Sequence, residues 1–178
     1  MQLARSAPDA ESAWRDLVEW VSSEVGPRLS LPIREVDLLS DVLSVRDQLS
    51  VLLESEPPPS AIEALYFGLF DAVSENDVEE IGYYVAGIER FDPADGESLC
   101  DPAWWPDGRY LVSSALQAVK SAELNAAAAD QLSESEFLAY AGQLGAGLIV
   151  TRFSIRGLDD GRAVVVGFDS GDFATIGS

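Results

Sequence analysis

The chain of 178 residues contains no histidine, one cysteine (Cys100) and one lysine (Lys120). Without histidine it lacks the side chain that most often acts as a general base or zinc ligand near neutral pH. A lone cysteine excludes an intramolecular disulfide and any chemistry that needs two thiols, so we interpret Cys100 as a buried or incidental thiol. A local serine–lysine pair would need a serine three positions before Lys120, where the chain has Gln117. We therefore assign no catalytic residue.

Long hydrophobic runs are also missing. No stretch approaches the roughly 20 apolar residues that cross a bilayer, and the first residues lack the apolar segment of a secretory signal. We expect a cytoplasmic protein with no membrane partner. Hydrophobic residues nevertheless make up 47% of the chain, which is too apolar for a disordered acidic polymer. The chain should fold, and its length suits one domain.

What the chain has in excess is negative charge. It carries 31 Asp and Glu against 11 Lys and Arg, a formal net charge of −20. Residues 61–108 alone hold 12 acidic groups and one basic group. Such a field repels nucleic acid and attracts basic partners, so we expect a basic protein partner and no nucleic acid. Adaptation to high salt is the alternative explanation, although it predicts a more even spread of charge.

The front of the chain has the apolar spacing of helices. Helices are predicted over residues 9–25 and 40–54, with Asp9 as the N-cap of the first helix and Gly26-Pro27 as its stop.

The polyproline stretch Pro57–Pro59 is a stiff spacer. We interpret it as a joint within a single domain of residues 1–178, between a helical part, 1–56, and an α+β part, 60–178.

The remainder is predicted to alternate strands and helices. The apolar run 62–71 is typical of a central strand covered on both faces, and Gly68, Gly82 and Gly87 indicate bulges or close backbone approach. A capping box at Ser133 and Glu136 predicts the start of a helix. The expected elements are strands 62–71 and 80–88, helices 109–129 and from 133 onward, and strands 163–168 and 173–176 joined through Ser170-Gly171. This order predicts an α+β fold, with an antiparallel or mixed sheet of about four strands flanked by about four helices.

Residues 91–108 form a long loop with three prolines, and loops of this length are usually functional or disordered. The paired indoles of Trp104 and Trp105 beside acidic residues form an aromatic anchor suited to a basic protein surface. Packing against the core is the alternative, which we favour for at least one of the two. The candidate partner-binding residues are Trp104, Trp105, Asp92, Asp95, Glu97, Asp101 and Asp107.

The same loop raises a second hypothesis. Its carboxylates at Asp92, Asp95, Glu97 and Asp101 are the ligand type that calcium and magnesium prefer. The spacing does not match a calcium-binding loop, so we expect no metal and no other cofactor. A carboxylate pair for acid–base catalysis cannot be located from sequence. A metal-dependent or carboxylate-based enzyme therefore stays an alternative.

The segments LYFGLFD, IGYYVAG, WWPDGRY and GFDSGDF resemble parts of the small acidic immunity proteins of bacterial toxin systems. The resemblance implies a bacterial protein that inhibits a basic partner, such as a nuclease toxin, by stoichiometric binding without a cofactor. It assigns no functional residues. The third hypothesis is a structural or oligomerising protein whose charge serves solubility alone, and the sequence does not define an oligomeric state.

Overall fold

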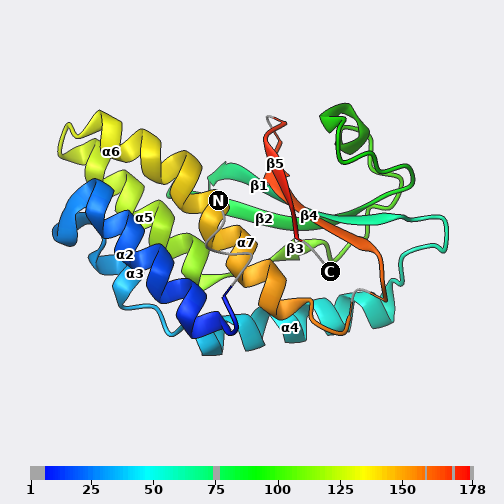
Figure 1. Ribbon diagram of the computed structural model, residues 1–178. Coiled ribbons are helices and arrows are strands. Elements are labelled where there is room, and N and C mark those ends of the chain that lie inside the picture. The colour runs from blue at the N-terminus through cyan, green and yellow to red at the C-terminus, as the bar shows by residue number, and fades with distance from the viewer. Residues whose placement is uncertain (1–6, 74–76, 159, 170, 177–178) are drawn as a thin grey trace.

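The computed structural model describes residues 7–73, 77–158, 160–169 and 171–176. Its helices lie beside one face of a twisted sheet (Figure 1). The elements are, in chain order, α2 (Ala10–Leu29), α3 (Leu31–Arg34), α4 (Leu38–Ser55), β1 (Ala64–Val73), β2 (Glu79–Ile88), η1 (Gly96–Leu99), β3 (Tyr110–Leu111), α5 (Ser114–Ala128), α6 (Leu132–Phe137), η2 (Leu138–Gly142), α7 (Gln143–Ser154), β4 (Ala163–Phe168) and β5 (Phe173–Ile176).

The predicted α+β fold is confirmed. The sheet is mixed, with the order β3-β2-β1-β4-β5; β1 pairs antiparallel with β2 and parallel with β4. The described residues thus form five strands rather than about four, because β3 adds a short edge strand next to β2. The hairpin between β4 and β5 turns at Gly171, whose φ of 106° suits glycine; its predicted partner, Ser170, lies outside the described residues.

Alternation along β1 and β2 divides the apolar residues between the two faces of the sheet. Phe67, Leu69 and Tyr83 point into the main core shared with the helices. Tyr66 and Tyr84 point to the opposite face, where they join a smaller cluster beneath residues 91–105 that includes Leu99. The sheet is therefore covered by helices on one face and by a loop on the other.

The first two predicted helices are confirmed in type and position. Asp9 caps α2 by accepting a 2.7 Å hydrogen bond from the Ser12 amide. At the predicted stop, Gly26 leaves the helical region with φ 81° and ψ 164°, and a kink separates the rest of α2. The second helix, α4, buries Val45 and Leu49 fully.

The prediction of a helix beginning at residue 109 is wrong. The chain is extended there as β3, and α5 begins only at Ser114. A contact with α4, which is distant in the sequence, explains the difference. The Gln48 side chain on α4 bonds both the N–H and the C=O of Val112, each at 2.9 Å, and so occupies the free edge beyond β3.

The start of α5 is fixed from a distance by Asp41 on α4. This buried carboxylate accepts hydrogen bonds from the Ser114 amide at 2.6 Å and from the Ala115 amide at 3.3 Å. It also accepts from the hydroxyls of Ser113 and Ser114. A carboxylate at this end complements the partial positive charge of the helix N-terminus. Asp41 therefore ties α4 to α5.

The predicted capping box is also wrong. The Ser133 hydroxyl bonds the neighbouring Glu134 carboxylate, and α6 begins at Leu132 without a side-chain cap. The helix then passes through a turn of π-helix, η2, into α7, which ends at Ser154. The helix expected from residue 133 onward therefore extends to residue 154.

The main core includes residues of the helical part, such as Leu17 and Val45, together with residues of the sheet. Within the described residues, no helix is both long enough and apolar enough to span a bilayer.

Candidate functional site

The face of the sheet away from the α-helices carries the rings of Phe70 and Tyr84, and each lies opposite a glycine of the neighbouring strand. A Cβ at Gly68 would lie 2.2 Å from the ring of Tyr84, and one at Gly82 would lie 2.2 Å from the ring of Phe70. Both glycines therefore provide the close approach that the sequence indicated, because each makes room for a ring lying across the neighbouring strand. The two rings also contact each other, with centroids 5.9 Å apart.

The structure separates the two tryptophans. Trp104 is 8% exposed and pairs with β2 at Gly87, whose amide donates a 2.9 Å hydrogen bond to the Trp104 carbonyl. Trp105 is 48% exposed, and its indole stacks on Tyr84 with ring centroids 5.5 Å apart. The core alternative is thus confirmed for Trp104, which is poorly placed to meet a partner. Trp105 is the member of the pair that is exposed at the surface.

Arg109 lies beside this indole. Its guanidinium is 5.5 Å from the centroid of the Trp105 ring and 4.9 Å from that of Tyr110, and it donates a 3.1 Å hydrogen bond to the Pro106 carbonyl. Within the described part of the chain Arg109 forms no ion pair. The exposed rings therefore already hold one guanidinium by cation–π contact.

Asp169, at the start of the β4–β5 turn, completes the surface. It accepts a 2.7 Å hydrogen bond from the Tyr84 hydroxyl. Burial, together with the hydrogen bond and charge of Asp169, raises the pKa of Tyr84 well above its usual range, so the hydroxyl stays a donor. We call the surface formed by Phe70, Tyr84, Trp105, Arg109, Tyr110 and Asp169 the aromatic face; it lines an open cavity of about 420 Å³.

A second cavity, of about 280 Å³, adjoins the aromatic face and shares Tyr84, Trp105 and Asp169 with it. The exposed thiol of Cys100 lines this cavity. So does Tyr66, whose hydroxyl donates a 3.1 Å hydrogen bond to the carbonyl of Phe168. Burial and the nearby charge of Asp169 raise the pKa of Tyr66, so its hydroxyl also stays protonated.

The five predicted acidic residues of the loop, Asp92, Asp95, Glu97, Asp101 and Asp107, are all exposed. Two of them have local roles: Asp92 accepts from the amide of Ala94, and Asp95 caps η1 through the amide of Glu97. Among the described residues, no group of three Cys, Asp or Glu side chains is arranged to hold a metal ion. The carboxylates of this loop thus order its backbone and add negative charge beside Trp105.

Sequence reasoning found Trp105 but missed most of its neighbours. Phe70, Tyr84, Tyr110 and Asp169 were not singled out as binding residues. The usable signal is the pairing of ring and glycine two positions apart in both strands, Gly68 with Phe70 and Gly82 with Tyr84. It becomes informative only with the register that places Gly68 opposite Tyr84 and Phe70 opposite Gly82.

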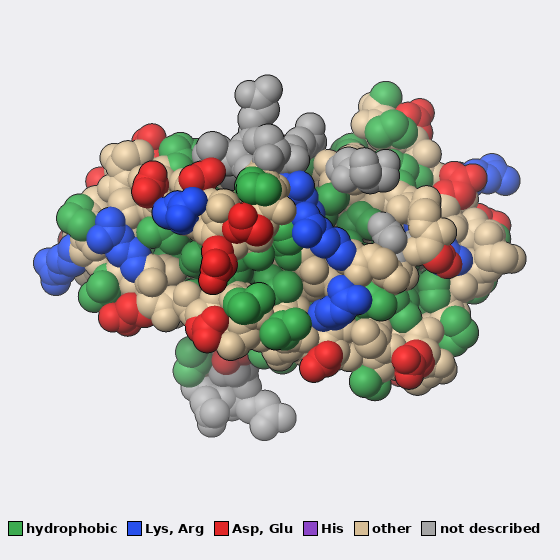
Figure 2. Space-filling model, turned by 60° about the horizontal axis from the view of Figure 1, so that its bottom comes forward, with side chains coloured by type: hydrophobic (Ala, Val, Ile, Leu, Met, Phe, Trp, Pro, Cys, Tyr) green, Lys and Arg blue, Asp and Glu red, His purple; other side chains and the backbone are tan. Residues whose placement is uncertain are grey.

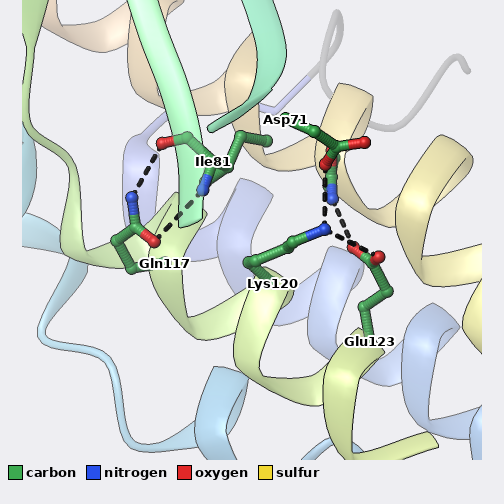
Figure 3. Close-up of polar contacts among 6 residues, drawn as sticks. Asp71, Ile81, Gln117, Lys120 and Glu123 are labelled. Atoms are coloured by element: carbon green, nitrogen blue, oxygen red, sulfur yellow. Dashed lines mark hydrogen bonds and ion pairs between the residues drawn. The ribbon is translucent and has the colours of Figure 1, made fainter. Parts of the chain in front are cut away.

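A separate polar cluster surrounds the only lysine (Figure 3). Lys120 on α5 is 3% exposed, and its ammonium lies 2.8 Å from the carboxylate of Asp71 and 2.9 Å from that of Glu123. Gln143, directly after the π-helical turn, donates a 2.6 Å hydrogen bond to Glu123. Nearby, the Gln117 side chain bonds both backbone groups of Ile81 at the edge of β2.

The charge state of Lys120 decides what this cluster does chemically. Burial lowers the pKa of Lys120, but the hydrogen bonds to Asp71 and Glu123 and their charges raise it, and the resulting pKa lies above the usual 10.5. A protonated amine is neither a nucleophile nor a base. The cluster therefore joins β1, α5 and α7 and gives no support to a catalytic lysine.

Comparisons of this chain with protein-family models, with curated proteins and with solved structures found no match.

Proposed function

We propose that this protein is a non-enzymatic acidic binding protein that engages a basic protein partner through the aromatic face, in the manner of an immunity-type inhibitor. One observation carries the proposal. A half-exposed indole, Trp105, stacks on Tyr84 at the face of the sheet away from the α-helices, in a chain with a net charge of −20.

Electrostatics support a cationic partner. Every described acidic residue between positions 61 and 108 is exposed. Of these, only Asp71 takes part in an ion pair within the described part of the chain. Unneutralised surface carboxylates speed the encounter with an oppositely charged protein, whereas buried anchors mainly slow its release.

The rings of the aromatic face supply such anchors. Tyr110 is 59% exposed and Trp105 is 48% exposed, and both are residue types that dominate binding energy when a partner covers them. The position of Arg109 over these two rings illustrates the side-chain chemistry they accept. An arginine or lysine of the partner makes the same contact, with Asp169 as the neighbouring carboxylate.

The test uses a short peptide of alternating arginine and glycine as a defined cationic probe, with titration calorimetry as the measurement. Trp105→Ala is expected to weaken binding by about thirtyfold, because a central aromatic anchor typically contributes about 2 kcal/mol. The matched control is Tyr140→Ala, which removes a ring with the same 48% exposure from the π-helical turn η2.

The control variant should bind within about twofold of the unmodified protein, since surface substitutions outside an interface have small effects. Binding should also persist at raised salt, because the aromatic contribution is not screened as exposed charges are. Equal affinities of the two variants would contradict the proposal, as they would reduce the interaction to nonspecific charge attraction.

A further inference from the structure

Arginine side chains gather around a cavity at the end of α7. A cavity of about 590 Å³ lies there, between the α7 terminus and strands β4 and β5. Three of the ten arginines of the chain line it: Arg152, Arg156 and Arg162. Basic side chains gather near the middle of the face shown in Figure 2. In a protein with a net charge of −20, three arginines around one cavity need an explanation.

Arg152 and Arg156 are spaced one helical turn apart. Arg152 lies in the last turn of α7 and Arg156 just beyond it, and both guanidinium groups lie over the ring of Phe153, 5.1 and 4.3 Å from its centroid. Burial and the charge of Arg156 lower the pKa of Arg152.

Two further arginines, Arg46 and Arg162, lie at this end of α7. Arg46 donates a 2.7 Å hydrogen bond to the carbonyl of Arg156, which brings another guanidinium to this end of α7. Arg162 is fixed by the carboxylate of Asp160 and the carbonyl of Ile62. Arg156 itself is exposed and has no ion pair within the described residues.

A helix C-terminus attracts basic side chains through its partial negative charge, and that effect accounts for Arg152. It does not account for Arg156, which lies beyond the last turn and faces the same cavity. Guanidinium groups bind phosphate oxygens through paired hydrogen bonds. Ile155, Val164 and Ile176 add an apolar wall beside them. We propose that this cavity binds the phosphate group of a small phosphorylated molecule.

The test measures the affinity of inorganic phosphate for the full chain, by calorimetry and phosphorus NMR at constant ionic strength. Saturable binding is expected. Arg156→Gln should weaken it about tenfold or more, because one charge-assisted contact is lost. Arg156→Lys keeps the charge but loses the paired N–H donors of the guanidinium. Its affinity for phosphate should lie between that of the unmodified protein and that of Arg156→Gln. The matched control is Arg90→Gln, which removes the same charge from an exposed position in the loop after β2 and should leave binding unchanged.

Several results would overturn the proposal: no saturable binding of phosphate, equal binding of acetate, or equal losses in Arg156→Gln and Arg90→Gln. Binding of a glutamate-rich peptide without binding of phosphate would also overturn it and would assign the cavity to an acidic protein segment. Circular dichroism of each variant establishes that it is folded. The outcome is independent of Trp105, so this proposal and the proposed function fail or succeed separately.

Discussion

Replacing Lys120 by alanine is expected to lower the free energy of unfolding by about 3–5 kcal/mol, because removing one member of a buried ion pair leaves the other charge uncompensated. Most of the loss comes from the Glu123 carboxylate, which is left without a counter-charge and whose side chain is only 12% exposed. The Asp71 side chain is 81% exposed, so water can hydrate its carboxylate instead. Urea unfolding at neutral pH measures the change.

A second pair of variants separates charge from packing. Lys120→Met keeps most of the apolar stem of the side chain. The unfolding free energy that this variant loses therefore reports mainly the unpaired Glu123 carboxylate. Adding Glu123→Gln to Lys120→Met removes that charge and should restore more than half of the lost stability, because neutral buried groups replace an ion pair at little cost. If the double variant is no more stable than the single one, the cluster stabilises the fold through packing alone.

The pH dependence of this contribution has a definite sign. The folded-state pKa of Lys120 lies above its usual value of 10.5. The stabilisation is therefore complete below the unfolded-state pKa and is lost as pH rises through the folded-state pKa. The difference in unfolding free energy between the unmodified protein and Lys120→Met should stay constant near neutral pH and shrink above about pH 10.5. A difference that does not change with pH would contradict the ion-pair account.

The second large effect is expected at Asp41. Asp41→Ala should lower the free energy of unfolding by about 3 kcal/mol, because it leaves two amides at the start of α5 and two serine hydroxyls without their buried acceptor. The matched control is Asp37→Ala, which removes an exposed carboxylate that caps α4 through the amide and hydroxyl of Ser40.

Asp37→Ala should cost much less, since water replaces an exposed cap. Urea unfolding of both variants compares the two caps directly. Equal losses of unfolding free energy in the two variants would mean that Asp41, by joining α4 to α5, stabilises the fold no more than a local helix cap does. The Asp41 variant should also show faster amide exchange in the first turn of α5, where its hydrogen bonds are lost.

The parts of the fold that sequence predicted are those whose signals are local. Asp9 and Gly26 set the ends of the first helix through one side-chain cap and one backbone conformation, and both act within a few residues. The strand at 64–73 is apolar at most positions because both of its faces are covered, a property that can be read without knowing what covers them.

The parts that were missed are set by distant partners. Residues 109–112 have no strong local preference, and pairing with β2 and with the side chain of Gln48 makes them extended. The capping box at Ser133 failed because its hydroxyl bonds Glu134 instead. In both cases tertiary contacts or a competing side chain decided the local structure.

The candidate site also combines residues that the local sequence could indicate with residues that only the fold brings together. The sequence marked both indoles of the acidic loop as candidates, but only the structure shows that Trp105 is exposed and that Trp104, paired with Gly87, is buried. Phe70, Tyr84 and Asp169 converge only through the register of β1 with β2 and β4. No single stretch of sequence contains that information.

The central claim is that Trp105 contacts a cationic partner. Nitrogen-15 NMR of the indole N–H signals tests it most directly, because the chain has four tryptophans and two of them, Trp14 and Trp104, are buried. On titration with the arginine–glycine peptide, the Trp105 signal should shift in step with binding while those of Trp14 and Trp104 stay in place. Saturated binding with an unmoved Trp105 signal would contradict the account.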